Sequence, residues 1–348
     1  MNTKKKTLAV LFGGHSSEYE VSLQSAAAVL EAVDTERFDP LPIGITKDGN
    51  WHHYLGTYSA IAAGTWADDP TLLRPAAFSP SRGAPGVWEN HNGEWALRRI
   101  DLAFPVLHGK NGEDGTVQGL FELAGIPLVG CGTLSSALCM DKDRAHKLVS
   151  LAGIAVPKSV VLEENTAAQQ KILSTLTFPV FVKPVRAGSS FGVTRAEDGT
   201  ALDAAIDMAF RYDSSVIVEE AVPGFEVGCA VLGTDTLTVG RADEIELSGG
   251  FFDFEEKYTL KTSRIHMPAR VDAETERRIQ EAAKVIYRAL GCSGFARVDL
   301  FLTPSGELVF NEVNTIPGLT AHSRFPNMMK GIGLSFPQMI DRLLGLYV

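Results

Sequence analysis

The chain has 348 residues, which exceeds one ordinary domain and predicts two or three packed units. A hydrophobic content of 45% with 21% charged residues describes a globular protein with an ample core, and the net charge of −10 excludes a general nucleic-acid or membrane-surface role. The four cysteines have neither metal-ligand spacing nor the density of a disulfide scaffold, and no apolar run is long enough for a membrane span. We therefore expect a cytoplasmic protein.

The chain opens with the pattern of a doubly wound α/β domain, which we expect to occupy residues 1–131. An apolar strand over 8–12 leads through a glycine turn into a helix over about 21–33, and a second strand follows over 38–45. We expect the stretch from about 49 to 95 to be an irregular insertion, because its Gly, Pro, Ala and Trp residues follow no clear period. The remaining elements of this domain are strands over 102–107 and 126–129 and a helix over 117–123.

Two further α+β units are expected, over 132–220 and 221–348. Both alternate short apolar strands with helical patterns, so the fold class is α/β with three domains. The clearest strands cover 156–161, 179–184, 216–219, 295–301 and 308–314, and the clearest helices cover 135–152, 274–290 and 335–344.

The most informative segment is a predicted hairpin in which apolar strands carry polar side chains at one end. Asp299 lies in the first strand, and the second strand ends in Glu312 and Asn314. A hairpin of this register brings the three side chains together. Two carboxylates and an amide suit Mg²⁺, which takes its remaining ligands from water and nucleotide phosphates. A single carboxylate here would more often be a solvated hairpin end, but three such residues beside Arg297 favour a metal site.

Two lysines and a small-residue loop predict contacts to phosphates. Lys183 ends an apolar strand immediately before a proline, and Lys142 is a second candidate cation. The loop over 186–192 offers backbone N–H groups at its glycines and the hydroxyls of Ser189 and Ser190. It is not the nucleoside-triphosphate P-loop, which needs GxxxxGK[ST] at the start of a helix. Alone, each lysine is more readily a surface charge and the loop is as readily an ordinary turn. Together they indicate a nucleotide.

An acidic strand end completes the candidate nucleotide site. Glu219 and Glu220 lead through Val222 to Glu226, across a Pro-Gly pair. In a cleft between two domains, such a connection offers a carboxylate to an adenine amine, backbone groups to the edge of the ring, and another carboxylate to ribose hydroxyls. If these residues do not line such a cleft, an acidic linker explains them equally well.

Taken together, these nucleotide-site residues resemble those of the ATP-grasp ligases. Three further segments resemble the signatures of one family among them, the D-alanine–D-alanine ligases. The matching segments follow one another in the same order as in the family. The resemblance extends from about residue 7 onward and is interrupted only by residues 49–95. The segments are Gly13-Gly-His-Ser-Ser-Glu18-Tyr-Glu-Val-Ser22, His108-Gly-Lys-Asn-Gly-Glu-Asp-Gly115 and Asn311-Glu-Val-Asn-Thr-Ile-Pro-Gly318.

The resemblance implies an ATP-dependent, ADP-forming carbon–nitrogen ligase. The carboxylate of a first D-alanine attacks ATP and becomes an acyl phosphate, and the amine of a second substrate then attacks that carbonyl while phosphate leaves. By position, Glu18 matches the carboxylate that receives the first D-alanine ammonium, and His108 matches a histidine beside that substrate. Arg297 and the Gly318 N–H match the donors to the tetrahedral oxyanion.

The resemblance also implies a three-domain ATP-grasp fold with a lid. The unit over 132–220 corresponds to the central ATP-grasp subdomain, and 221–348 to the C-terminal catalytic domain with a lid loop over about 246–266. Lys257 matches a lid lysine that reaches the γ-phosphate, while Ser189 and Tyr258 match the partners that close the lid together with Glu18. Closure would exclude water, which otherwise hydrolyses an acyl phosphate.

Two departures from the housekeeping pattern resemble the ligases of vancomycin resistance. Ala187 stands where housekeeping ligases usually have Glu, and Arg324 follows the second-substrate serine, Ser323, where they usually have Leu or Met. A cation with several donors there can hold a polar or negatively charged substrate. The phrases around Phe252 and Arg324 look most like the D-alanine–D-serine type, and Tyr258 is the residue that the D-lactate enzymes lose.

The resemblance implies ATP, two Mg²⁺ ions for which Mn²⁺ can substitute, and a homodimer. The expected substrates are D-alanine and D-serine, in the synthesis of modified peptidoglycan precursors. A housekeeping D-alanine–D-alanine ligase stays open, and a D-alanine–D-lactate ligase is less favoured. A nucleotide-binding regulatory protein without catalysis would be expected to have lost a metal ligand or an oxyanion donor, and all of these are present in the sequence.

Overall fold

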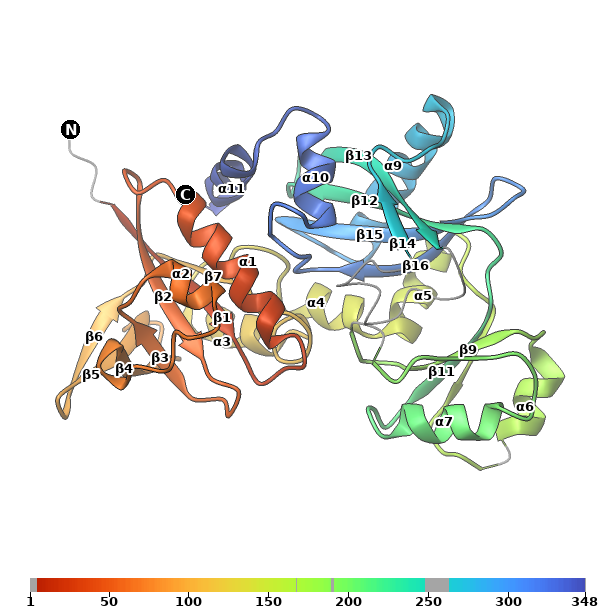
Figure 1. The fold of residues 1–348 in the computed structure, drawn as a ribbon, viewed down its shortest axis with the longest axis horizontal. Coiled ribbons are helices and arrows are strands. Elements are labelled where there is room, and N and C mark those ends of the chain that lie inside the picture. Colours follow the sequence, from red (N-terminus) through yellow and green to blue (C-terminus); the bar gives the residue numbers. More distant parts are fainter. Residues whose placement is uncertain (1–4, 167, 189–190, 248–262, 348) are drawn as a thin grey trace.

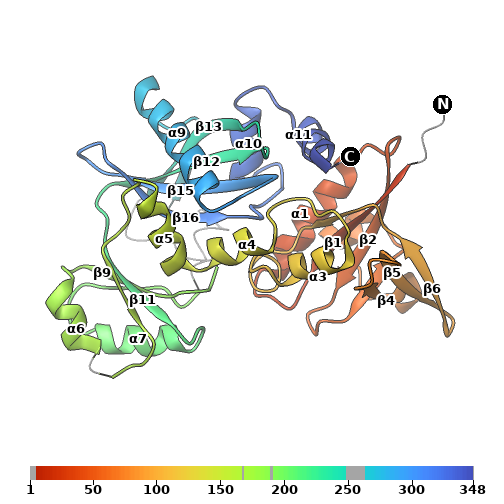
Figure 2. The same ribbon diagram turned by 180° about the vertical axis from the view of Figure 1, so that it is seen from behind.

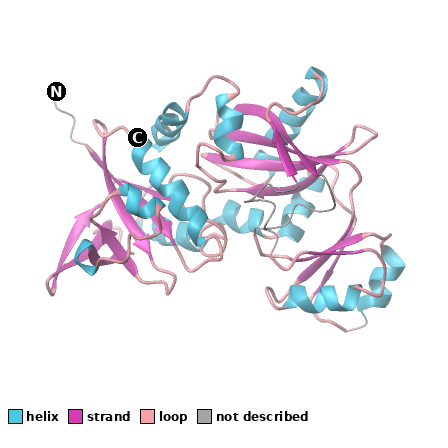
Figure 3. Ribbon diagram, viewed as in Figure 1, coloured by secondary structure: helices cyan, strands magenta, loops and turns pink. Residues whose placement is uncertain are grey.

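A computed structural model describes residues 5–166, 168–188, 191–247 and 263–347. Their strands form three sheets, of seven, four and five strands. Each sheet is the centre of one lobe, and Figure 1 shows the first lobe at one end of the molecule and the other two at the opposite end. Helices pack beside all three sheets (Figure 3). Among the helices described, none has the length and apolar character that crossing a membrane requires.

The first sheet contains the predicted doubly wound unit, in the strand order β6-β5-β4-β3-β2-β1-β7. Leu8, Val10 and Phe12 of β1 (Lys6–Gly13) lie in the core that includes α1 (Tyr19–Ala32). Ala9 and Leu11 lie in the core that includes α3 (Thr116–Ala124). A parallel strand buried on both faces has a continuous apolar run, which makes it recognisable in the sequence. Its parallel neighbours are β2 (Phe38–Ile45) and β7 (Leu102–Pro105).

The prediction of an irregular insertion over 49–95 is wrong, because this stretch extends the first sheet with antiparallel strands. Asn92 and Gly93, with φ of 53° and 98°, form the turn of its last hairpin. Exposed residues such as Trp95 interrupt the apolar pattern, as expected for strands with one open face. The Asn-Gly pair is the sequence signal for this hairpin. The elements are β3 (Trp51–Tyr54), α2 (Tyr58–Ala62), η1 (Pro70–Leu72), β4 (Leu73–Ser79), β5 (Gly86–His91) and β6 (Glu94–Arg99).

Two smaller predictions also need correction. The strand expected over 126–129 is reduced to one isolated bridge, between Ala103 and Leu128. The helix expected over 135–152 is divided into α4 (Thr133–Met140) and α5 (Lys142–Leu151). Asp141 separates them, because its extended backbone ends α4 and its carboxylate accepts the Arg144 N–H at 2.9 Å as the N-cap of α5.

The second sheet has the order β10-β9-β11-β8 and is antiparallel. Its core joins the strands to two helices, which lie along the outer edge of the lobe (Figure 1). The elements are β8 (Ser159–Leu162), α6 (Ala168–Thr175), β9 (Val180–Pro184), β10 (Thr194–Ala196), α7 (Leu202–Phe210) and β11 (Val216–Glu220).

The third sheet has the order β14-β13-β12-β15-β16 and lies between two cores. Val227 and Cys229 of β12 pack with the long helix α9 on one side, and Ala230 and Leu232 pack toward α10 and α11 on the other. The elements are β12 (Phe225–Leu232), β13 (Thr238–Leu247), β14 (Ser263–His266), α9 (Ala273–Ala289), β15 (Phe295–Leu302), β16 (Leu308–Asn314), α10 (Arg324–Lys330), α11 (Phe336–Leu344) and η2 (Gly345–Tyr347).

Shared cores connect the lobes. Met339 and Leu343 of α11 belong to the same core as Leu8 of the first sheet and Ala230 of the third. Helices α4 and α5 run between the first lobe and the other two (Figure 2), and Val149 of α5 packs into the core of the third sheet. Residues that end strands and helices at this junction can therefore face one another, although they come from all three lobes.

Candidate active site

The β15–β16 hairpin brings the three predicted metal ligands together. Asp299 pairs with Glu312 and Arg297 pairs with Asn314, just before a register shift between Asp299 and Leu300. Arg297 donates to the carboxylate of Asp299 at 2.7 to 3.0 Å, and Asn314 Nδ2 lies 2.9 Å from Asp299 and 3.5 Å from Glu312. The predicted hairpin is confirmed. Its two carboxylates and amide form an oxygen-rich donor set, which fits Mg²⁺.

A row of residues across three strands extends this hairpin. Gly228 of β12 lies between Asp243 of β13 and Asp299 of β15. A Cβ at Gly228 would collide with Arg324 Nη2 and would lie 2.7 Å from Asp243 Oδ1 and 2.9 Å from Asp299 Oδ1. Glycine therefore leaves the space above the sheet in which the Arg324 guanidinium lies.

Arg324 is buried among carboxylates, with 8% of its side chain exposed. Its Nε and Nη2 donate to Asp243 at 2.7 and 2.8 Å, and its Nη1 donates to Glu226 at 2.9 Å. Asp299 Oδ1 lies 3.3 Å from Nη2. Burial opposes the charge, but Asp243, Asp299 and Glu226 raise the pKa of Arg324. The arginine is therefore a fixed cation of the interior rather than a surface residue.

Ser323 and Gly318 lie against each other beside this cluster. A Cβ at Gly318 would lie 2.8 Å from Ser323 Oγ, so the loop before α10 approaches the serine closely. Ser323 Oγ accepts the Thr320 N–H at 3.1 Å and lies 2.8 Å from Thr320 Oγ1. The predicted second-substrate serine and the predicted oxyanion donor are thus neighbours.

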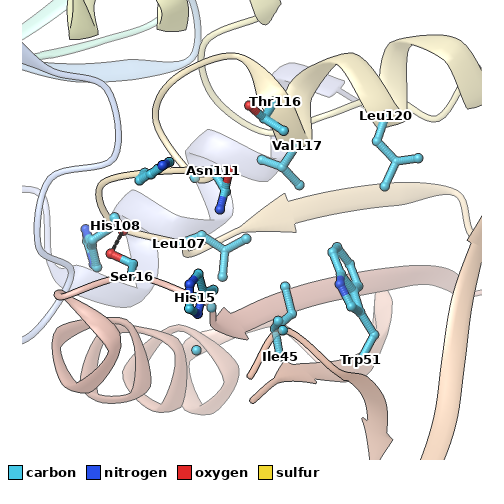
Figure 4. Close-up of a pocket in the computed structure, with 15 residues that line it drawn as sticks. His15, Ser16, Ile45, Trp51, Leu107, His108, Asn111, Thr116, Val117 and Leu120 are labelled. Carbon is cyan, nitrogen blue, oxygen red and sulfur yellow. Dashed lines mark hydrogen bonds between the residues drawn. The ribbon is translucent and has the colours of Figure 1, made fainter. Parts of the chain in front are cut away.

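His108 contacts the same loop from the first lobe. Its Nδ1 lies 2.8 Å from the carbonyl oxygen of Ile316, and its Nε2 lies 3.2 Å from Ser25 Oγ. Burial lowers the pKa of His108 against the opposing effect of Glu18, so the ring is neutral at pH 7. Ser16 Oγ donates to the His108 carbonyl at 2.9 Å, which joins the two glycine-rich loops of the first lobe (Figure 4).

Glu18 lies between the first and second lobes. A Cβ at Gly109 would collide with Glu18 Oε2, and one at Gly188 would lie 3.1 Å from it. Both loops therefore approach this carboxylate through glycines. Ser189 follows Gly188 directly but lies outside the described residues, as do the predicted site residues Ser190, Phe252, Lys257 and Tyr258.

The candidate nucleotide residues gather at the second sheet. Lys183 Nζ donates to Glu219 at 2.6 Å, and Lys142 Nζ donates to the carbonyl oxygen of Ala187 at 2.7 Å. Burial opposes the charge of Glu219, but Lys183 and His146 hold the pKa of Glu219 below its ordinary value. The two lysines and Glu219 thus share one region at the ends of β9, β11 and α5.

The other predicted nucleotide residues differ in their surroundings. Glu220 accepts the Thr177 N–H at 2.8 Å and lies 3.4 Å from Lys158 Nζ. Val222 is half-buried in the connection to β12. Glu226 contacts Arg324 rather than standing alone in a linker, and its role toward ribose stays a prediction.

The sequence interpretation missed three residues of this region. Asp243 is fully buried against Arg324, Glu113 contacts the loop around Ile316, and His146 lies 3.9 Å from Glu219. The signals available were weak: one acid among several charged residues of β13, an acid next to another in the His108 loop, and a histidine on a helix face.

This arrangement defines a class of protein. Three α/β lobes converge on a carboxylate hairpin, two lysines and glycine-rich loops, which is the organisation of an ATP-grasp ligase. Residues 7–131 match the family model for the D-ala D-ala ligase N-terminus, and residues 148–345 match that for the C-terminus. The chain belongs to the D-alanine–D-alanine ligase family and is an ATP-dependent ligase.

Individual relatives are similar over almost the whole chain. The crystal structure of VanG D-Ala:D-Ser ligase from Enterococcus faecalis is 65% identical, with a TM-score of 0.94, and the match covers 99% of this chain and 100% of that one. Vancomycin B-type resistance protein VanB from Enterococcus faecalis is 47% identical over 99% of each chain. Vancomycin/teicoplanin A-type resistance protein VanA from Enterococcus faecium is 45% identical over 97% of each. The predicted family and fold class are confirmed.

Proposed function

We propose that the protein joins D-alanine to D-serine through a D-alanyl phosphate, supplying modified peptidoglycan precursors of the vancomycin-resistance type. The observation that carries this proposal is the buried Arg324 cluster beside Ser323 and Gly318. Its support is the 65% identity to a VanG D-Ala:D-Ser ligase, together with the resistance proteins among the relatives.

In the first step, Glu18 would hold the ammonium of D-alanine, because its carboxylate lies where the Gly109 and Gly188 loops meet. The D-alanine carboxylate then attacks the γ-phosphorus of ATP and ADP leaves. Lys142 and Lys183 would hold phosphate oxygens, and Glu219, kept ionised by Lys183, would accept from the adenine amine. Asp299, Glu312 and Asn314 would hold Mg²⁺, which supplies positive charge between the phosphates of the nucleotide.

In the second step, the neutral amine of the second substrate attacks the acyl carbon and an oxyanion forms. Inorganic phosphate leaves as the carbonyl reforms, and the surplus proton on the new amide nitrogen passes to the phosphate. Arg297 and the Gly318 N–H would donate to this oxyanion. Asp299 accepts from Nε and Nη2 of Arg297 and so fixes the plane of the guanidinium. Arg297 stays positively charged, because Asp299 raises its pKa against the effect of burial.

The choice of second substrate would depend on Arg324. The sequence interpretation expects Arg324 to hold a polar or negatively charged substrate, but its nitrogens already donate to Asp243 and Glu226. We propose that Ser323 contacts the substrate carboxylate and that the Arg324 cluster lines a polar niche for the D-serine hydroxyl. A satisfied hydroxyl contributes roughly 0.5–1.5 kcal/mol, so D-serine would be preferred by up to about tenfold.

Competition between second substrates tests the proposal. D-alanine and D-serine are supplied at equal concentration with ATP and Mg²⁺, and the products are separated by mass. We expect D-alanyl-D-serine to exceed D-alanyl-D-alanine. If the protein forms D-alanyl-D-alanine alone, it is a housekeeping ligase. In a parallel assay with D-lactate added, D-alanyl-D-lactate as the main product would mean that the lid interpretation is wrong as well.

A further inference from the structure

The first lobe holds the loop over 315–319 through both backbone polar groups of one residue, Ile316. The Ile316 N–H donates to Glu113 Oε1 at 2.8 Å, and the Ile316 carbonyl oxygen lies 2.8 Å from His108 Nδ1. One residue past Gly318, the Leu319 N–H donates to Ser25 Oγ at 3.2 Å. These contacts cross from the first lobe to the third, between residues far apart in the sequence.

The second oxygen of Glu113 is also in use. Glu113 Oε2 accepts the Gly109 N–H at 3.0 Å, and Thr315 Oγ1 lies 3.5 Å from Oε1. Gly109 is the residue whose missing side chain leaves room for Glu18. The Glu113 carboxylate therefore connects two backbone segments. One is Gly109, which lies beside Glu18, and the other is Ile316, which precedes Gly318.

We propose that Glu113 is a positioning residue, which fixes the Gly318 N–H relative to the first-substrate loop and so places the oxyanion donor. The inference rests on the proposed role of Gly318. Ile316 is two residues from Gly318 in an irregular loop. Losing its N–H contact therefore loosens the segment that carries the donor and leaves only the His108 and Ser25 contacts, among those described, to hold it. Reacting groups must be held within about 0.5 Å of productive geometry, which a loop without this contact would not maintain.

Three charged or titratable groups from other segments act on Glu113 among the described residues. Glu18 precedes α1, Arg297 lies on β15 and the thiol of Cys139 lies on α4, while Asp114 adjoins Glu113 in its own loop. His108 contacts the carbonyl of Ile316, whose N–H donates to Glu113. Burial and Glu18 raise the pKa of Glu113 to about 8, against its contacts with Gly109 and Ile316 and the charge of Arg297. An ionised carboxylate accepts both N–H groups best. An ammonium bound at Glu18 would favour that ionised form.

Two variants of Glu113 and one matched control test the proposal in the full chain. Glu113→Ala removes both contacts, and Glu113→Gln is the milder variant that keeps the size of the side chain. Asp114→Asn is the control, because Asp114 accepts only from Asn111 and Thr116 of its own segment among the contacts described, at 2.8 and 3.0 Å. Hydrogen exchange at the amides of 315–319 reports the contact directly, and steady-state kinetics reports its consequence.

We expect faster exchange at Ile316 in both Glu113 variants and unchanged exchange there in Asp114→Asn. In Glu113→Gln, kcat should fall by roughly 10- to 100-fold, less than the loss from removing an oxyanion donor, while the KM for ATP stays unchanged. The rise of kcat/KM for D-alanine with pH through about 8 should disappear in Glu113→Gln, because the group that ionises is gone.

Unchanged exchange at Ile316 in both Glu113 variants would overturn the contact itself. Faster exchange with wild-type kcat would overturn the positioning of Gly318. Equal loss of kcat in Asp114→Asn would assign the effect to the His108 loop as a whole and overturn the specific role of Glu113. If the wild-type chain makes no ligation product, the proposed function fails, and the exchange data still report the contact independently.

Discussion

Two sheets of this protein each surround a buried carboxylate with basic side chains. In the third sheet, Asp299 is 1% exposed and contacts Arg297 at 2.7 Å and Arg324 at 3.3 Å. In the first sheet, Glu89 is 3% exposed, and its basic neighbours are less closely placed. These neighbours are His53, His91, Arg74 and Arg98, at 3.1, 3.4, 3.7 and 4.0 Å.

The two clusters differ in which other parts of the fold contribute residues to them. The neighbours of Glu89 all lie on adjacent strands of one sheet, from β3 to β6. The row containing Asp299 also meets Arg324 of α10, and Gly318 lies against Ser323, just before that helix. Facing strands can therefore assemble a charge cluster alone, but a site for chemistry needs loops from other lobes to converge on it.

The largest effect should come from removing one charge of the candidate metal site. Glu312→Gln and Asp299→Asn each replace a carboxylate of the hairpin, and we expect turnover to fall by about 10³-fold because the charge that holds Mg²⁺ is lost. Phosphate release with D-alanine and ATP measures turnover, and thermal melts check that the fold persists. Glu89→Gln is the matched control, since it neutralises a buried carboxylate whose basic neighbours, among the described residues, lie on its own sheet. Near-normal ligation by either hairpin variant would exclude this metal site.

Local patterns predicted the part of the site that lies on one hairpin. Asp299, Glu312 and Asn314 are close in sequence, and the alternation of a strand determines which face they share. The partners that no pattern indicated are distant: Asp243 lies 81 residues from Arg324, and Glu113 lies 203 residues from Ile316. Such contacts depend on how the lobes pack, and a single sequence carries no periodic signal for them.

A smaller effect is expected from Arg324, on product choice. Arg324→Leu should move the product mixture toward D-alanyl-D-alanine by up to about tenfold, because the polar niche becomes apolar. Removing the cation alone leaves Asp243 buried without its partner, which costs stability. The double variant Arg324→Leu with Asp243→Asn removes that charge as well, and comparison of the two separates stability from selectivity. An unchanged product ratio in both would show that Arg324 does not determine the choice.

The smallest effect on turnover should come from Glu89, whose expected role is stability. Burial raises the pKa of Glu89, but His53, Arg98 and His91 lower it further, so its net pKa lies below the ordinary value of 4.5. A carboxyl with a lowered folded-state pKa stabilises the fold above that ordinary value and loses the contribution as the pH falls through the lowered one. Glu89→Gln should therefore cost about 1–3 kcal/mol at pH 7, and the difference from wild type should shrink only as the pH falls below about 4.5. Thermal melts across this pH range measure it, with Glu94→Gln on the exposed neighbouring strand as the control. A difference that stays constant with pH would mean that the ionised form of Glu89 is not what stabilises the first sheet.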